Sequence, residues 1–563
     1  MKFWLETGGD SYASLSMNWM PESKYHGLLA KGGQMVCSGV LERFNGEELT
    51  IDGYDGSAFW FHSDDVRGVK TVRVRSGKST INYRLRGKGE LEISPYLNSR
   101  SIYATSEGFP AEVMVSDKSV KIRTKAESGD EAIIHGGRFE REERWERLEY
   151  PYDRERGEAW EDTVFIPGRF LIEVKGDGSP SFFISTGVED DLGEGKQVRR
   201  GFATIWRNCN SFLLGNSIKA GYYWFGEWGR DSLISLPGLT LVRGDFRSGF
   251  SILERMADLE DGGLIPNFIS DKPSYNSVDA PLWFIDRVFQ LYKKTGNEGV
   301  LKRFCPTIRS IIAGYMEGTD FGIWEKRDLI HHNPQVTWMD AVVDGVPATP
   351  RSCAVEIQAL WYNGLQTASD LLAILGEKRE SEDLGEEAIR VKERFNLSFP
   401  TIDERGRKYL RDSLDCKDEV RPNQIFAISL DHPILDESMW DGVMKVVVGD
   451  LLTPYGPRSL SPRDDKFIAR YEGDIRQRDL SYHNGPIWPW LIGPFIDAYL
   501  KTYGRDHFAA HILDRLAAEE NRICYGYIPE LYDAQPPYCP KGAVAQAWSM
   551  AEVLRGANLL GLV

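Results

Sequence analysis

Two acidic residues stand alone in loop-like segments that are rich in aromatic residues and proline. Asp340 lies in VTWMDAVVDG, and Glu530 lies much later in the chain, in YIPELYDAQPP. Cleavage of a glycosidic bond uses such a pair of carboxyl groups, one as a general acid and the other as a general base. The two segments therefore predict a sugar-cleaving enzyme with Asp340 and Glu530 as its catalytic residues.

The neighbours of Asp340 indicate the general acid. An aspartic acid stays protonated near neutral pH only if it is partly desolvated or lies close to another negative charge. Asp340 follows Trp338, which favours desolvation, whereas Asp344 precedes Gly345 and is typical of a turn. We therefore expect an uncharged Asp340 and an ionised Glu530 on opposite sides of one glucose cavity.

Glu530 is the expected base that activates water. It comes one residue after Pro529, in a position that suits a loop better than an ordinary helix. Asp533 is the competing candidate, and an ordinary turn is the alternative for the Pro-Glu pair. Lys541, which precedes the last helical segment, can bind hydroxyl groups or hold Glu530 ionised.

Three further loops combine glycine, proline, aromatic and polar residues, as the wall of a pocket does: GYYWFGEWGRD, DGGLIPNFISDKPSYNSVDAPLWF and DLSYHNGPIWPW. Structural roles remain open alternatives here. Arg230 and Asp231 can engage backbone groups or cap the next helix, Asp279 stands at an expected N-cap, and His483 can be a core histidine. The expected substrate contacts are Trp224, Phe225, Trp228, Arg230, Asp231, Asn267, Tyr275, Asp279, Trp338, His483, Asn484, Trp488 and Lys541.

Composition narrows the class of protein. Of the 563 residues, 42% are hydrophobic and 27% charged, as in ordinary globular proteins, and the net charge is −16. An acidic chain lacks the basic surface that nucleic acid requires, and suits a neutral sugar. The seven cysteines are scattered without a CxxC pair, and the pair His331 and His332 has no spaced third ligand. We expect no metal, no cofactor, a reducing cytoplasmic location and no membrane span.

Residues 1–190 predict strands. Segments such as TVRVRSG, STINYRLRG, GELEISPYL and RFLIEVKG alternate polar and apolar residues between turns of glycine, aspartate and serine. This pattern favours an antiparallel β-sandwich. The charged stretch RFEREERWERLEYPYDRERGEAWED interrupts the pattern and is expected to be a solvated excursion. Residues 191–204 are the expected linker.

Residues 205–563 predict helices. Amphipathic segments such as PLWFIDRVFQLYKKTGN, where Gly296 is expected to end the helix, alternate with loops rich in aromatic residues. The segment has space for about a dozen helices of ordinary length. A closed ring of helix hairpins is the natural arrangement, and its loops would converge on a central pocket at one end.

Taken together, these motifs resemble the amylo-α-1,6-glucosidase part of glycogen debranching enzymes, in its single-activity prokaryotic-type form. WFGEWGRDSLISLPGL, GLIPN followed by YNSVDAPLWF, TWMDA, YHNGPIWPWL, PELYD and PKGAVAQAWSMAEVLR occur in that family's order. KYHGLLA and YPYDRERGEAWEDTVFIPGRF, in the first 190 residues, are also similar to the family. The resemblance covers nearly the whole chain.

The resemblance implies an N-terminal β-sandwich and a C-terminal (α/α)6 barrel, as in glucoamylase-like enzymes. It also implies inverting hydrolysis of α-1,6-linked glucose at the branch points of glycogen or limit dextrins, with Asp340 of TWMD as the acid and Glu530 of PELYD as the base. No glucanotransferase half precedes Met1, so a separate glucanotransferase or phosphorylase is expected to trim the branched α-glucan first. The alternatives are another hydrolase or a phosphorylase with this barrel, glucoamylase-like or trehalase-like, and a non-catalytic glucan-binding protein.

Overall fold

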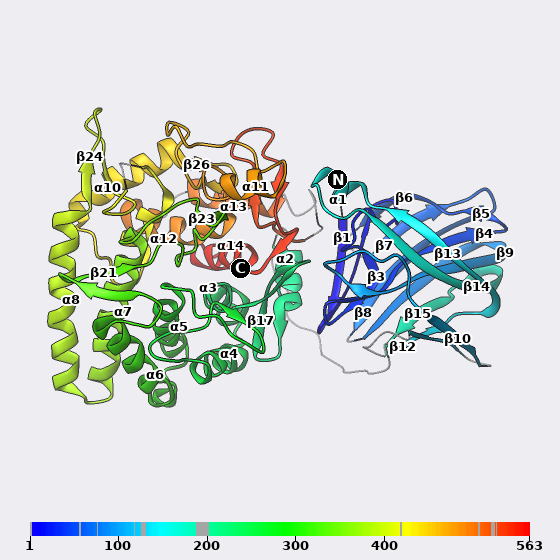
Figure 1. Cartoon of the computed structure of the whole chain (residues 1–563), viewed down its shortest axis with the longest axis horizontal. Coiled ribbons are helices and arrows are strands. Elements are labelled where there is room, and N and C mark those ends of the chain that lie inside the picture. The colour runs from blue at the N-terminus through cyan, green and yellow to red at the C-terminus, as the bar shows by residue number, and fades with distance from the viewer. Residues whose placement is uncertain are drawn as a thin grey trace. The chain divides into compact units, whose positions relative to one another are not determined.

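The computed structural model describes residues 3–55, 58–75, 77–116, 119–124, 131–186, 202–416, 419–504, 507–518, 524 and 526–563. Two compact units divide the chain: residues 1–196 with 521–526, and residues 197–520 with 527–563. The expected linker at 191–204 falls mostly outside the described residues. Strands form the first unit, and the second is mainly helical (Figure 1).

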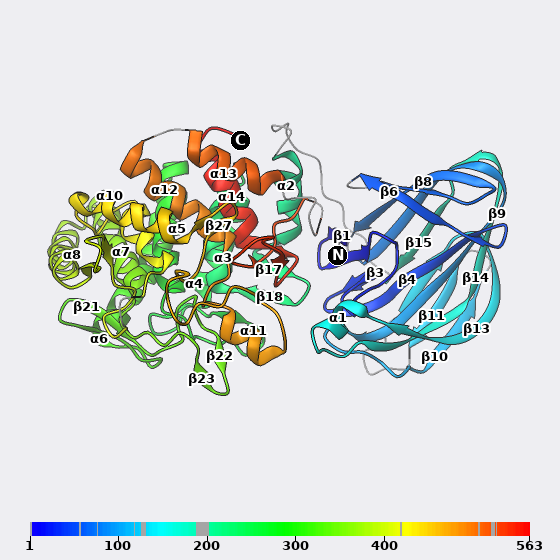
Figure 2. The ribbon, with the colours of Figure 1, turned by 90° about the horizontal axis from the view of Figure 1, so that it is seen from above.

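The first unit is an antiparallel sheet system that curves around a common interior (Figure 2). Its neighbouring strands run in the order β1-β2-β3-β4-β9-β15-β12-β11-β10, and β8 and β14 also pair with β9. The core includes Trp4, Phe59 and Ile93. The elements are β1 (Phe3–Gly8), β2 (Ser11–Ser16), β3 (Gly27–Lys31), β4 (Gln34–Phe44), β5 (Glu47–Glu48), β6 (Thr50–Asp55), β7 (Ala58–His62), β8 (Val66–Arg75), β9 (Lys78–Ser101), β10 (Ala111–Val115), β11 (Val120–Thr124), β12 (Glu131–His135), β13 (Arg138–Glu149), α1 (Pro151–Glu155), β14 (Glu161–Gly178) and β15 (Ser181–Ser185).

Two expectations for this unit are wrong. The segments STINYRLRG and GELEISPYL form one strand, β9, because Gly87 and Gly89 allow close approach of neighbouring chain rather than a turn. A Cβ atom at Gly87 would lie 2.7 Å from the Asp65 carbonyl oxygen. The charged stretch is not an excursion either. Its first half is β13, which pairs with β14, and exposed charges such as Arg147 find ion-pair partners across the ladder.

Helices and short antiparallel strand pairs build the second unit. The helices are α2 (Ala203–Asn208), α3 (Gly229–Leu236), α4 (Phe246–Asp258), α5 (Ala280–Thr295), α6 (Glu298–Glu317), α7 (Val355–Ile374), α8 (Lys378–Ser398), α9 (Phe426–Ser429), α10 (Glu437–Val446), α11 (Ile475–Ser481), α12 (Ile492–Tyr503), α13 (His507–Ala518) and α14 (Ala547–Leu559). The strands are β16 (Leu213–Leu214), β17 (Ser217–Tyr222), β18 (Phe225–Trp228), β19 (Phe268–Ile269), β20 (Ile323–Lys326), β21 (Leu329–His332), β22 (Val342–Val343), β23 (Val346–Pro347), β24 (Pro400–Ile402), β25 (Lys408–Leu410), β26 (Leu452–Thr453), β27 (Gly456–Pro457), β28 (Leu531–Tyr532), β29 (Pro540–Lys541) and β30 (Ala545–Gln546).

Local sequence explains the end of α5. Gly296 ends α5 with a φ of 62°, and its N–H donates to the Tyr292 carbonyl, which confirms the expected stop.

The beginning and the end of this unit also meet. Helix α14 packs against α3, and β30 pairs with β17 through Gly221 and Gln546. No helix of the described residues is long and apolar enough to cross a membrane.

Candidate active site

Arg230 joins three of the predicted loops. It lies in the first turn of α3 and is 2% exposed. Its Nε donates to both carboxylate oxygens of Asp279 at 2.8 Å, and its Nη1 donates to Asp340 Oδ2 at 3.1 Å. Its Nη2 donates to the Val336 carbonyl oxygen at 3.1 Å. One buried guanidinium group thus fixes the candidate acid relative to the start of α5, through charge-assisted hydrogen bonds.

The capping alternative is wrong for Asp231, whereas Asp279 stands at the expected N-cap position without a side-chain cap. Helix α3 has Trp228 in its N-cap position, so Asp231 lies inside the first turn. Asp279 does occupy the N-cap position of α5, but its side chain makes no capping hydrogen bond. Ser277 Oγ accepts instead from the Ala280 N–H at 3.1 Å. The carboxylate of Asp279 accepts from Arg230 instead, and that of Asp231 accepts from Gln546 Nε2.

The charge state of Asp340 differs from the expectation. Its side chain is 31% exposed. Burial alone would raise the pKa of Asp340, but His483 and Arg230 lower it, and the net direction is below the ordinary value. Arg230 makes the direct contact, since His483 Nε2 lies 3.9 Å from Asp340 Oδ1, beyond hydrogen-bond distance. In the free site Asp340 is a carboxylate, and the expectation of an uncharged acid is wrong because the sequence did not reveal its cationic neighbour.

Glu530 is held at both carboxylate oxygens. It is 2% exposed, the Tyr482 hydroxyl donates to its Oε1, and the Ala543 N–H donates to its Oε2 at 2.8 Å. Gly542 makes this approach possible. Its φ is 69°, and a Cβ atom there would overlap the Glu530 carboxylate. Glu530 is therefore presented with a defined orientation, as a general base requires.

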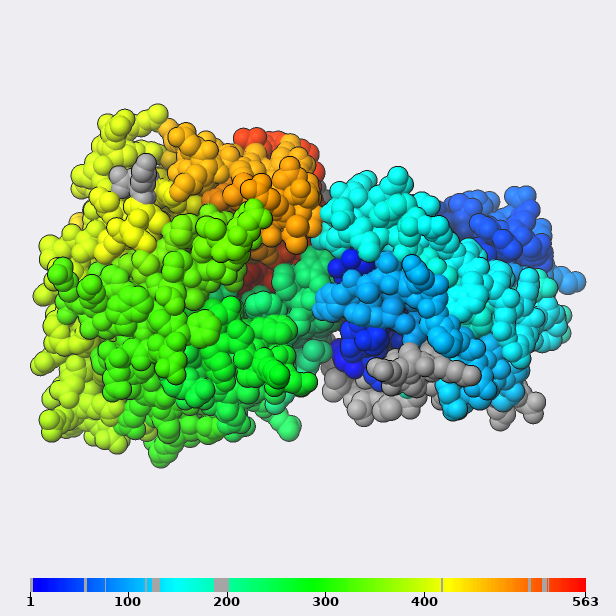
Figure 3. Space-filling model, in the orientation of Figure 1, coloured from blue at the N-terminus to red at the C-terminus, as the bar shows by residue number. Residues whose placement is uncertain are grey.

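Asp231 lies within electrostatic reach of both catalytic candidates. It is 7% exposed, and its Oδ1 accepts from Gln546 Nε2 at 3.1 Å. Burial raises the pKa of Asp231 to about 7, Arg230 opposes this, and the negative charges of Asp340 and Glu530 add to it. The fold thus gathers carboxyl groups from distant segments around one buried position. Red C-terminal residues are visible at depth between the green and orange segments of this unit (Figure 3).

His483 combines core packing with a place beside Asp340. Its ring is stacked on Trp488 with centroids 5.1 Å apart, and it packs edge to face with Trp338 at a centroid distance of 5.2 Å. Both ring nitrogens are buried without a hydrogen-bond partner among the described residues. Burial lowers the pKa of His483 to about 4, so the ring is neutral at pH 7. A buried polar group without a protein partner is a candidate for a bound hydroxyl group or an ordered water.

Trp338 and Trp488 are covered by protein rather than open to a ligand. They are 3% and 1% exposed. Trp338 Nε1 donates to Asn423 Oδ1 at 2.8 Å, and Trp488 Nε1 donates to the Tyr482 carbonyl at 3.1 Å. In this structure the two indoles support the loops that carry Asp340 and Tyr482.

Two other predicted substrate contacts already use their polar atoms inside the protein. Asn484 Oδ1 accepts from Arg421 Nη2 at 2.9 Å, and its Nδ2 donates to the Leu480 carbonyl at 2.9 Å. The Tyr275 hydroxyl donates to the Leu259 carbonyl at 3.0 Å. These contacts assign both side chains structural roles in the free protein, which loop sequence alone does not reveal.

Asn267 is the opposite case. Its side chain is fully buried, and neither amide atom has a hydrogen-bond partner among the described residues. Its carbonyl accepts from the Gly229 N–H at 2.8 Å, which ties it to the start of α3. Lys541 lies opposite Leu531, the residue that follows Glu530, in the ladder of β28 and β29. It makes no ion pair within the described ranges.

An aromatic row precedes α3. Trp224, Phe225 and Trp228 are all half-buried, and Trp228 also meets Phe268, which is 39% exposed, at a centroid distance of 5.1 Å. Trp228 and Phe225 pack edge to face with their centroids 6.4 Å apart. These rings keep partly open surfaces, as a sugar-contacting wall requires.

The competing acidic residues serve other roles. Asp533 is buried and accepts from the Tyr471 N–H at 2.9 Å and from Arg470 Nη1 at 3.2 Å. Asp344 has a φ of 51° in the turn after β22 and pairs at the surface with Arg476, which confirms its turn assignment. The described residues contain no cluster of three or more potential metal ligands.

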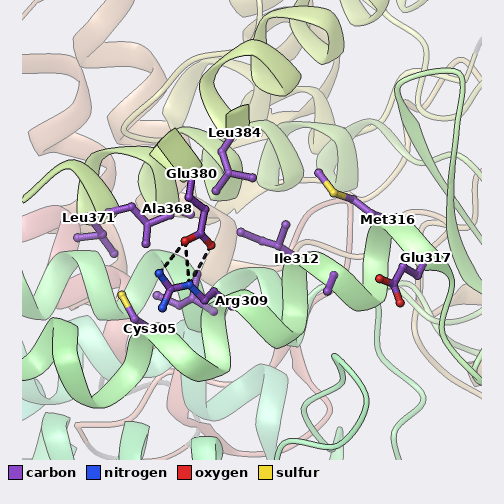
Figure 4. Close-up of a pocket in the computed structure, with 12 residues that line it drawn as sticks. Cys305, Arg309, Ile312, Met316, Glu317, Ala368, Leu371, Glu380 and Leu384 are labelled. Carbon is purple, nitrogen blue, oxygen red and sulfur yellow. Dashed lines mark hydrogen bonds and ion pairs between the residues drawn. The ribbon is translucent and has the colours of Figure 1, made fainter. Parts of the chain in front are cut away.

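A separate apolar cavity of about 320 Å3 lies between α6, α7 and α8. Ile312, Leu371 and Leu384 line it, and Arg309 and Glu380 form an ion pair across it (Figure 4). None of the predicted site residues lines this cavity. It is therefore distinct from the cluster around Arg230.

Several residues of the site were given no role at the sequence level. The weak signal for Tyr482 was its place in YHNGP, and for Gly542 its place in PKGAVAQAW, just before the last helix. Gln546 and Asn423 have no local signal, because their partners lie far away in the sequence.

Two family models match the chain. Residues 207–555 match the family model of amylo-alpha-1,6-glucosidase, and residues 57–180 match that of the glycogen debranching enzyme N terminal region. The glycogen debranching enzyme of Saccharomyces cerevisiae is 24% identical over 458 residues, which cover 58% of this chain. The chain spans only 29% of the length of that yeast protein.

A solved structure shows the fold. A bacterial glucoamylase complexed with acarbose aligns with a TM-score of 0.63 and 12% identity, covering 99% of this chain and 93% of the glucoamylase. This confirms the predicted fold class, an N-terminal antiparallel β domain followed by a glucoamylase-like helical barrel. Together with the family match across most of the second unit, the evidence shows that the chain belongs to the amylo-alpha-1,6-glucosidase family of glycoside hydrolases.

Proposed function

We propose that this chain releases glucose from α-1,6-linked branch points of glycogen or limit dextrins by inverting hydrolysis, with Asp340 as the general acid and Glu530 as the general base. The observation that carries the proposal is the gathering of two differently held carboxylates, one on Arg230 and one on Tyr482, around buried Asp231. The family match supports the substrate class.

The proposed reaction is a single displacement. Asp340 donates a proton to the glycosidic oxygen while Glu530 takes a proton from a water molecule that attacks the anomeric carbon from the opposite face. This reaction requires carboxyl groups roughly 6.5–9.5 Å apart, so that water fits between them and the sugar. Because Arg230 and His483 favour the charged form of Asp340, the productive complex is the one in which Asp340 has taken up a proton.

The remaining loops would bind the terminal glucose. Asp231 and Asn267 offer buried polar atoms, and the half-buried rings of Trp224, Phe225 and Trp228 offer apolar surfaces. We further propose that a separate glucanotransferase or phosphorylase trims the branch beforehand, and that the protein acts in the cytoplasm. The seven free cysteines support a reducing compartment.

The test measures free glucose from an isomaltosyl-branched dextrin and a linear dextrin, without phosphate. Release from the branched substrate, with β-glucose as the first product by NMR, supports the proposal. Asp340→Asn and Glu530→Gln should each lower kcat by about 10²–10⁴-fold while retaining dextrin binding. Asp344→Asn, in the exposed turn beyond Asp340, is the matched control and should keep full activity.

Three results would reject the proposal. Glucose 1-phosphate formed only with phosphate would indicate a phosphorylase, and dextrin binding without any glucose would indicate a binding protein. Initial α-glucose would exclude inversion and favour a covalent intermediate.

A further inference from the structure

Arg421 is a buried arginine that binds four acceptors from three segments. It is 2% exposed and lies just before the turn at Pro422–Ile425. Its Nε donates to Glu419 Oε2 at 2.7 Å, and its Nη1 donates to the carbonyl oxygens of His483 at 2.6 Å and Ser459 at 3.1 Å. Its Nη2 donates to Asn484 Oδ1 at 2.9 Å. All three guanidinium nitrogens are therefore used.

The same network reaches the segment that carries the acid. Asp412 Oδ2 lies 3.8 Å from Arg421 Nε and accepts from Arg351 Nη1 at 3.1 Å. Asn423 Nδ2 donates to Asp412 Oδ1 at 2.8 Å, and Asn423 Oδ1 accepts from Trp338 Nε1 at 2.8 Å. Trp338 is two residues before the acid in TWMD, so the backbone of that loop is tied to this buried cluster.

On its other side the network reaches the base. Arg421 fixes the backbone at His483 and the side chain of Asn484, which directly follow Tyr482. The Tyr482 hydroxyl donates to Glu530 Oε1. Movement of this backbone would move both the ring of His483 beside the acid and the hydroxyl group that orients the base.

We propose that Arg421 is a positioning residue that sets the spacing between the loop of Asp340 and the loop that orients Glu530. The inference rests on the proposed function, because it concerns the separation that water attack requires. In this role Arg421 contacts only protein groups and not the substrate. A planar guanidinium group can hold four acceptors in fixed directions, which the three donors of a lysine ammonium on a flexible stem cannot reproduce.

The effect should appear in turnover rather than in substrate binding. Misplacement of catalytic groups by about 1 Å costs on the order of 10²-fold in rate. Arg421→Lys is therefore expected to lower kcat by about 10²-fold while KM for the branched dextrin changes by less than roughly threefold. The matched control is Arg555→Lys, in which a partly buried arginine of α14 loses its contacts with Glu552 and Asp497 away from these loops.

The experiment compares kcat, KM and thermal unfolding of the full chain and both variants. A kcat-selective loss in Arg421→Lys, absent from Arg555→Lys, supports the inference. Arg421→Lys with kcat within about threefold of the parent overturns it, as does an equal kcat loss in both variants. If Arg421→Lys does not fold, Asn423→Ala replaces it in the comparison with Arg555→Lys. A kcat-selective loss in Asn423→Ala then supports the inference, and a kcat within about threefold of the parent, or an equal loss in the control, overturns it. A parent chain that releases no glucose would instead reject the proposed function.

Discussion

Replacing Tyr482 with phenylalanine tests how Glu530 is presented. The substitution removes only the hydroxyl group that donates to Glu530 Oε1. The ring keeps its packing against Trp488, whose centroid lies 4.8 Å away, and Glu530 keeps the hydrogen bond from Ala543 at its other oxygen. The expected result is a base that is present but less firmly oriented.

The magnitude follows from the chemistry of this bond. A hydrogen bond to a charged group contributes about 1.5–3 kcal/mol, and about 1.36 kcal/mol corresponds to a tenfold change in rate. If the orientation of the base matters only when water attacks, most of this loss appears in kcat. Tyr482→Phe should therefore lower kcat by about 10–150-fold and leave KM nearly unchanged.

Steady-state glucose release from a branched dextrin provides the measurement. Tyr83→Phe is a matched control, because it removes a buried tyrosine hydroxyl that donates to Glu42 in the first unit. The control is expected to lower the melting temperature without lowering kcat. A kcat for Tyr482→Phe within about twofold of the parent would refute the reasoning, and so would an equal kcat loss in Tyr83→Phe.

Three further predictions concern the same site. Gly542→Ala should lower both kcat and melting temperature, because its φ of 69° and the Glu530 carboxylate leave no room for a methyl group; unchanged kinetics would contradict this contact. Since the pKa of Asp340 is lowered and the acid must be protonated, kcat/KM should fall as pH rises through the acidic range, and a rate profile flat to pH 8 would contradict it. Asp231 has a folded pKa of about 7, above its unfolded value, so its contribution to stability is complete below the unfolded pKa and lost as pH rises toward 7. Between pH 4 and pH 8 the melting temperature of Asp231→Asn should therefore fall less than that of the parent. Parallel curves of melting temperature against pH for variant and parent would contradict this.

Local pattern was sufficient for many of the elements, and it named the loops whose residues the fold brings around Arg230. Alternation predicted the strands, and a glycine stop predicted the end of α5, because these signals depend on neighbours in the chain. The same signals failed at Gly87, where glycine permits close packing instead of a turn. Loop composition led to Asp340 and Glu530, but their roles as acid and base remain proposals.

Tertiary contacts determine what the sequence did not reveal. The charge on Asp340 depends on Arg230, which is 110 positions away, and no local pattern reports that pairing. Asn484, Tyr275 and Asn267 are all polar residues in loops. Asn484 and Tyr275 hydrogen-bond to protein groups, whereas the amide atoms of Asn267 have no partner among the described residues. Only the folded arrangement separates these cases.

The pairing of β17 with β30 and the packing of α14 on α3 have a consequence for synthesis of the protein. All eight residues of α3 are buried, and the helix that covers it is made more than 300 residues later on the ribosome. A nascent chain therefore exposes apolar surface through most of translation, and such surface attracts chaperones and promotes aggregation. Glu530 joins its partners only in the last stage, so incomplete chains lack the base as well as the closing helix.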